Sequence, residues 1–206
     1  MSRLMGTTRL EAFSDAVIAI IMTIMVLELK VPHEADVASL APIGAIFASY
    51  VLSFVHLAIY WNNHHHMMQV AEHVDGAIMW ANMHLLFWLS LIPFATGWMG
   101  ENQFASTPTA MYGFVLLMSA VAYFILQRSI ITRDGPESLL AKAVGTDSKG
   151  KLSPVLYLIA IPLAFVFPLL SGALYVAVAI IWMIPDRRIE EVLPEERLTD
   201  PTPVDG

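Results

Sequence analysis

The chain of 206 residues contains no cysteine and few charged residues. Without cysteine it has no disulfides, no thiolate metal site and no cysteine nucleophile. Asp, Glu, Lys and Arg make up 14% of the residues, against about 25% in soluble domains. Hydrophobic residues make up 57%, and the mean hydropathy is +0.64. Because the charges are also segregated between long apolar windows, the composition predicts an all-α, polytopic membrane protein.

Apolar windows of membrane-spanning length define the predicted helices. A crossing helix needs roughly 20 apolar residues, and four windows of about that length lie at residues 12–29, 37–61, 77–100 and 104–127. A last window, residues 152–185, is too long for one crossing and short for two. Ser171-Gly172 near its middle has turn chemistry. We therefore expect a hairpin of two short helices broken there, and six transmembrane helices in total.

The distribution of positive charge predicts the orientation. With six crossings, all of the 11 Lys and Arg residues except Lys30 fall in the N-terminus, residues 62–76, residues 128–151 or the C-terminal tail. Cytoplasmic segments carry such an excess. Both termini are therefore expected in the cytoplasm, with residues 1–187 as a six-helix transmembrane domain and residues 188–206 as an acidic, solvated tail.

Asp15 stands at the start of the first apolar run, where a carboxylate needs a partner. On a helical wheel at 100° per residue, Ile20, Ile24 and Leu27 share one face, with Thr23 as its single hydroxyl. Asp15 falls on the opposite face. We therefore expect Asp15 to contact neighbouring helices, where a buried carboxylate must be hydrogen-bonded or paired.

The candidate partners of Asp15 lie at the end of the second span, in the polar stretch YWNNHHHMM at residues 60–68. Trp61, His64 and His65 lie on one side of a continuing helix. Asn82 of the third span and Arg9, one to two turns before Asp15, are further candidates.

The histidines at 64–66 admit three interpretations: a hydrogen-bond network, a pH-sensitive element or a metal site. Three consecutive helical residues spread over about 200°. They cannot all converge on one ion, so the spacing favours the network.

The motifs resemble those of the transmembrane protein 175 family of potassium channels, which occurs in lysosomes and in prokaryotes. Its first-helix pattern Arg-x-x-x-Phe-Ser-Asp is matched by Arg9, Phe13, Ser14 and Asp15. Its Trp-x-x-His-His pattern is matched by Trp61, His64 and His65. Two further elements are matched by Asn82, Leu85, Leu86, Pro93 and Phe94, and by the Pro-Asp-Arg at residues 185–187. His66 is an additional histidine outside the pattern.

The resemblance implies a prokaryotic single-repeat form in the cell membrane, with four copies around a pore lined by the first helix. The pore positions map onto Ile20, Ile24 and Leu27, and the hydroxyl linked to potassium preference maps onto Thr23. The remaining motif residues map onto an interhelical polar network: Arg9, Phe13, Ser14, Asp15, Trp61, His64, His65 and Asn82. The implied partners are the lipid bilayer and K⁺, with other monovalent cations and protons as further candidates. Neither cofactor, metal, nucleic acid nor enzymatic activity is implied.

The leading functional hypothesis is a potassium-preferring cation channel with a hydrophobic constriction that excludes water. The sequence has no Thr-Val-Gly-Tyr-Gly filter, so no cage of carbonyl oxygens is expected. The alternatives are a proton-coupled secondary transporter using Asp15 and the histidines, and an intramembrane metalloenzyme. The sequence shows no internal repeat of the kind common in secondary transporters, which counts against the first alternative.

Overall fold

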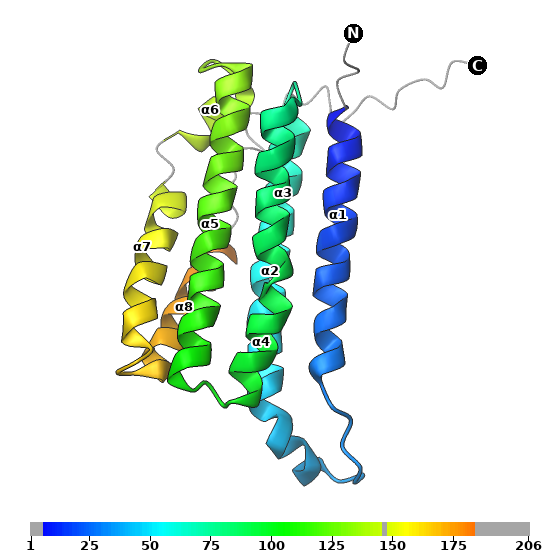
Figure 1. Cartoon of the computed structure of the whole chain (residues 1–206), viewed down its shortest axis with the longest axis vertical. Helices are drawn as coiled ribbons and strands as arrows, with labels where there is room; N and C mark the ends of the chain where they lie inside the picture. Colours follow the sequence, from blue (N-terminus) through cyan, green and yellow to red (C-terminus); the bar gives the residue numbers. More distant parts are fainter. Residues whose placement is uncertain (1–5, 146–147, 184–206) are drawn as a thin grey trace, which may run out of the picture.

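The computed structural model describes residues 6–145 and 148–183 as a bundle of antiparallel helices (Figure 1). These residues form eight α-helices and two 3₁₀ segments, joined by short connections: α1 (Thr7–Ile24), η1 (Met25–Glu28), η2 (Val37–Ile43), α2 (Gly44–Val70), α3 (Gly76–Ser90), α4 (Ile92–Glu101), α5 (Ser106–Asp134), α6 (Leu139–Val144), α7 (Ser148–Leu163) and α8 (Pro168–Met183). We call the end of the bundle where α1 and α3 begin the upper end, as it is drawn in Figure 1.

Four of the described segments are long and apolar enough to cross a membrane, namely Thr7–Glu28, Val37–Val70, Gly76–Glu101 and Ser106–Asp134. They correspond to the first four predicted spans. α8 is a shorter apolar helix that follows α7 as the second arm of a hairpin. The prediction of an all-α, multi-pass membrane protein is confirmed, and the count of six crossings stays a prediction.

The predicted break at Ser171-Gly172 is wrong. α7 ends at Leu163, and α8 begins at Pro168, so both residues lie inside α8. Proline suits the first position of a helix because its φ is preset and its missing N–H would have no partner there. The Ser171 hydroxyl donates to the Ala160 carbonyl at 2.8 Å, so it joins the two arms of the hairpin.

The third predicted span is interrupted at Leu91, between α3 and α4. Pro93 lacks the N–H that would donate to the carbonyl of Leu89, four residues earlier. At the break, the Leu91 N–H donates to the carbonyl of Trp88, three residues earlier, at 3.2 Å. The chain then continues as α4. The sequence prediction treated this span as continuous.

Several helices extend beyond their apolar windows at the upper end. α1 begins at Thr7, α2 continues to Val70 and α5 continues to Asp134. The motif residues of α1 and α2 are therefore all helical. The predicted tail and the Pro-Asp-Arg motif at residues 185–187 lie outside the described residues.

The core brings helices together through close backbone approaches and buried hydroxyls. A Cβ added at Gly100 of α4 would lie 2.8 Å from Ile46 Cα of α2. Next to this contact, Thr96 donates to the Ser53 hydroxyl at 2.6 Å, and Ser53 donates to Tyr112 at 3.0 Å. Small residues and shared hydroxyls are typical means of helix association in membranes. These contacts hold α2, α4 and α5 together, and α1 packs against α2.

Candidate functional site

α1 has one face against the bundle and one face turned away from it. The inner face is buried, at Ile18, Ile21 and Met25. The outer face carries the three predicted constriction residues, which are 59%, 43% and 77% exposed at Ile20, Ile24 and Leu27. α1 stands at one side of the bundle, so no other helix among the described residues covers this outer face (Figure 1). We call Ile20, Thr23, Ile24 and Leu27 the outer stripe.

The outer stripe continues past the end of the α-helix. Leu27 lies in the 3₁₀ segment that begins at Met25, so the wheel at 100° per residue does not apply to it. In a 3₁₀ helix residues three apart eclipse one another. Leu27 therefore remains in line with Ile24, although the sequence prediction assumed a regular α-helix.

Thr23 is the hydroxyl of the outer stripe, and its proton is already used within the helix. Its Oγ1 lies 2.9 Å from Ala19 O and 3.0 Å from Ile20 O. Because a hydroxyl has one donor and two acceptor lone pairs, Oγ1 remains able to accept. The exposed atom is thus suited to contact a cation or a water proton.

A buried string of polar side chains joins the upper halves of α1, α2 and α3. His64 Nε2 lies 2.8 Å from Asn82 Oδ1, so a neutral His64 carries its proton on Nε2 and donates to the amide. Asn82 Nδ2 donates to Ser14 Oγ at 2.8 Å, and Ser14 donates to Leu10 O at 2.8 Å. His64, Asn82 and Ser14 are each fully buried, so every lost bond would leave a costly unpaired group.

A second set of contacts holds α1 to α2. Trp61 Nε1 donates to Asp15 Oδ1 at 3.1 Å, and His65 Nδ1 lies 2.8 Å from Glu11 Oε1. The rings of Trp61 and His65 are stacked, with centroids 5.8 Å apart. Sequence reasoning missed Glu11, although its position one turn before Asp15 places it on the same helix face. Asp15 therefore faces α2 and not the outer stripe.

Arg9 and Phe13 do not join the other network residues within one chain. Both are exposed, and Arg9 has no ion pair among the residues the structure describes. At 100° per residue they fall within about 20° of Ile20, so they continue the outer stripe towards the upper end. The motif therefore splits between two faces of α1.

Glu11, Asp15 and His65 could hold a metal ion, since one ligand atom from each lies within 4.8 Å of the others. Each of these groups also has a protein partner in the contacts described above. These contacts therefore join α1 to α2 without an ion. Six residues of the predicted network lie together in these contacts: Ser14, Asp15, Trp61, His64, His65 and Asn82. The constriction residues and Thr23 lie on the outer face of α1, which the bundle leaves uncovered.

These features define a class: a multi-pass, all-helical membrane protein whose first helix is clamped on one side and uncovered on the other. A family model described as "Endosomal/lysosomal potassium channel TMEM175" matches residues 9–93, which contain both motifs. A potassium channel of Chryseobacterium sp. strain P1-3 is 52% identical over 187 residues, covering 91% of this chain and 97% of that protein.

The crystal structure of a lysosomal potassium-selective channel TMEM175 homolog from Chamaesiphon minutus superposes with a TM-score of 0.76 at 28% identity. It covers 87% of this chain and 97% of that chain. The endosomal/lysosomal proton channel TMEM175 of Danio rerio is 26% identical over 62% of this chain and 24% of its own length. The chain belongs to the TMEM175 family, and it is a membrane channel and not an enzyme.

Proposed function

We propose that the protein is a potassium-preferring cation channel of the cell membrane, in which four copies surround a pore lined by α1. The observation that carries the proposal is the outer stripe, which is exposed from Ile20 to Leu27 and apolar except at Thr23. One helix cannot enclose a lumen, and identical chains share an axis most simply in closed cyclic symmetry. The potassium channels among the relatives support the choice of ion.

The outer stripe suggests how such a pore would select and block ions. Rings of Ile20, Ile24 and Leu27 side chains would form hydrophobic constrictions, which gate by excluding water. The Thr23 hydroxyl oxygens would form the polar layer between them, where each oxygen can replace part of the hydration shell of a cation. The ring of Thr23 is therefore the proposed origin of potassium preference.

The proposed orientation has six crossings with both termini cytoplasmic. Among the described cations, Arg9 lies in the first turn of α1, Arg133 in the last turn of α5 and Lys142 in α6, and these three segments lie at the upper end (Figure 1). Lys30 follows the lower end of α1 and pairs with Glu101 at 3.3 Å. Positive residues concentrate on the cytoplasmic side, so the upper end is assigned to the cytoplasm.

The proposal is tested by recording purified protein in a planar bilayer with opposed potassium and sodium gradients. We expect discrete unitary currents whose reversal potential lies towards the potassium equilibrium potential. A reversal potential midway between the potassium and sodium equilibrium potentials would contradict potassium preference. Flux without unitary currents that saturates at low turnover would contradict the channel mechanism.

The alternative is a proton-coupled secondary transporter, in which Asp15 and His65 would relay protons. It is distinguished by imposing a proton gradient across vesicles with equal potassium inside and outside. A transporter would accumulate potassium against its gradient, whereas the proposed channel would leave the potassium concentrations equal. The placement of Asp15 against α2, away from the outer stripe, favours the channel.

A further inference from the structure

A groove lies between the start of α3 and the last turns of α5, away from the outer stripe. It is lined by Asp75 and Ala77 at the start of α3 and by Phe124, Ile125, Arg128, Ser129, Thr132 and Arg133 of α5. At 100° per residue, Phe124, Arg128 and Thr132 share one face of α5, and the remaining lining residues of α5 extend it to about half of the helix circumference. The groove is therefore formed mainly by the surface of α5, with Asp75 contributed by the N-cap of α3.

The lining of the groove changes from apolar to cationic towards the upper end. Phe124 and Ile125 are exposed hydrophobic side chains within the apolar segment of α5. Arg128 lies one turn, about 6 Å, further along the axis, and Arg133 follows near the end of the helix. An amphiphile with an apolar body and an anionic head matches this order.

The cations of the groove are only partly neutralised. The Arg128 guanidinium lies 5.2 Å from the centroid of the Phe124 ring, and it has no carboxylate partner in the part of the chain that the structure describes. Arg133 Nε lies 3.8 Å from Asp75 Oδ2, a long contact between partly exposed groups. Asp75 Oδ1 is already used to cap α3, where it accepts from the Ile78 N–H at 3.0 Å.

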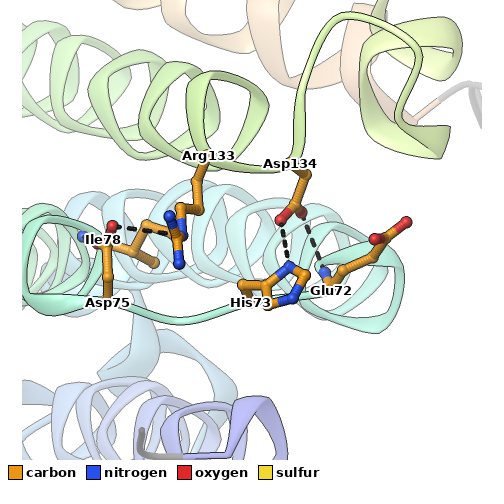
Figure 2. A network of polar contacts seen from close by, with 6 residues as sticks. All are labelled: Glu72, His73, Asp75, Ile78, Arg133 and Asp134. Atoms are coloured by element: carbon orange, nitrogen blue, oxygen red, sulfur yellow. Dashed lines mark hydrogen bonds and ion pairs between the residues drawn. The ribbon is translucent and has the colours of Figure 1, made fainter. Parts of the chain in front are cut away.

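The nearby Asp134 does not neutralise the groove either. Figure 2 shows its carboxylate turned towards Glu72 and His73, away from the Arg133 side chain. It accepts from the Glu72 N–H at 3.0 Å and lies 3.2 Å from His73 Nδ1, and its side chain is fully buried. Arg128 and Arg133 outnumber Asp75 in the lining, so the groove keeps a net positive charge next to the apolar side chains of Phe124 and Ile125.

We propose that this groove binds the phosphate headgroup of an anionic phospholipid, with an acyl chain lying along Phe124 and Ile125. Arginine is suited to a phosphate because its planar fork can donate two parallel hydrogen bonds. The depth also fits, since Trp80, one helical turn after Ala77 in α3, is 78% exposed, as in the aromatic belts of membrane interfaces. The leaflet is the cytoplasmic one in the orientation proposed above, where basic pockets between helices bind anionic lipids.

Native mass spectrometry of the purified full-length protein tests the proposal. Phosphatidylglycerol and phosphatidylcholine with the same acyl chains are added separately in detergent, and the bound lipids per chain are counted. We expect clearly tighter binding of phosphatidylglycerol. Arg128→Gln should weaken that binding about fivefold, and Arg128→Gln with Arg133→Gln should weaken it further, because each cation near a membrane surface contributes about that factor.

Lys142→Gln is the matched control, because it removes one positive charge from α6 outside the groove. It should leave lipid binding unchanged. Equal binding of the two lipids by the wild-type protein, or equal effects of Arg128→Gln and Lys142→Gln, would overturn the proposal. Competition by glycerol phosphate as strong as that by phosphatidylglycerol would assign the groove to free phosphate instead. The comparison of phosphatidylglycerol with phosphatidylcholine on the wild-type protein tests the proposal even if a variant does not assemble.

Discussion

At the scale of single residues, Thr23 is the polar member of an otherwise apolar outer stripe. Its hydroxyl proton is bound to carbonyl oxygens of its own helix, so only the oxygen lone pairs face outwards. Thr23→Val removes this oxygen and keeps the shape of the side chain. We expect a lower potassium-to-sodium permeability ratio with normal assembly, measured from reversal potentials.

The control for Thr23 is Thr107→Val, the same change at an exposed position near the start of α5. It should leave the permeability ratio unchanged. Equal ratios for wild type and Thr23→Val would remove Thr23 from the selectivity mechanism.

The buried string of His64, Asn82 and Ser14 predicts a loss of stability when its centre is removed. Asn82→Leu keeps the branched shape of the side chain, but it leaves the His64 Nε2–H without an acceptor. An unpaired buried donor costs about 1–3 kcal/mol, so the thermal unfolding temperature of the purified protein should fall. Asn62→Leu, at an exposed position of α2, should change stability by less than about 0.5 kcal/mol. Equal unfolding temperatures for both variants would contradict the role of the string.

The sequence predicted the network at some residues and not at others for a physical reason. Asp15 and Trp61 could be paired in advance because a carboxylate in an apolar segment requires a donor, and the polar end of the second span offered one. Glu11 was missed because the helix was assumed to start later. Arg9 and Phe13 were grouped with Asp15 by the motif, whereas the helical spacing places them on the outer stripe.

At the scale of helices, the crossings were readable from hydropathy but the breaks inside them were not. Three prolines lie in the first half of the last window, and only the structure shows that Pro168 begins the second arm. Pro93 similarly interrupts the third span. It has no N–H, so the carbonyl of Leu89, four residues earlier, loses its helical donor, and the helix breaks before the proline and not at it. A break depends on which backbone groups find partners, and this is not encoded in a hydropathy window.

The contact between α4 and α2 predicts that Gly100 tolerates no larger residue. In Gly100→Ala the new Cβ would lie 2.8 Å from Ile46 Cα, which is backbone and cannot rotate away. α4 would have to move from α2, and overpacking of this kind costs about 1–3 kcal/mol. The thermal unfolding temperature of the purified protein measures the effect.

Gly172→Ala is the matched control, because a Cβ there would meet nothing within 4 Å. Replacing a helical glycine with alanine favours the helix by about 1 kcal/mol, so this variant should be unchanged or more stable. Loss of stability in Gly172→Ala and not in Gly100→Ala would contradict the packing described for α4.

At the scale of the whole molecule, no other helix of residues 6–145 and 148–183 covers the outer stripe of α1. Fourfold assembly would bring four stripes together around one axis, and the proposed pore requires it. Native mass measurement of the purified protein in detergent should therefore show a tetramer. A population of monomers or dimers alone would contradict the proposed pore.

The final prediction concerns the constriction itself. In a tetramer the Ile20 side chains of four α1 helices would form an apolar ring, which blocks ions chiefly by excluding water. Ile20→Asn keeps the number of side-chain heavy atoms, but its amide allows water to remain in the narrow segment. We expect a higher unitary conductance and a lower potassium-to-sodium permeability ratio, both measured in planar bilayers.

The matched control is Ile180→Asn, the same change at an exposed position of α8, away from α1. It should leave conductance and permeability ratio at the wild-type values. Thr23 lies about 4.5 Å along the axis from Ile20. Water retained at the Asn ring should therefore also make potassium depend less on the Thr23 hydroxyl oxygens. If Ile20→Asn forms a tetramer with wild-type conductance and permeability ratio, then α1 does not line the pore and the outer stripe faces lipid instead.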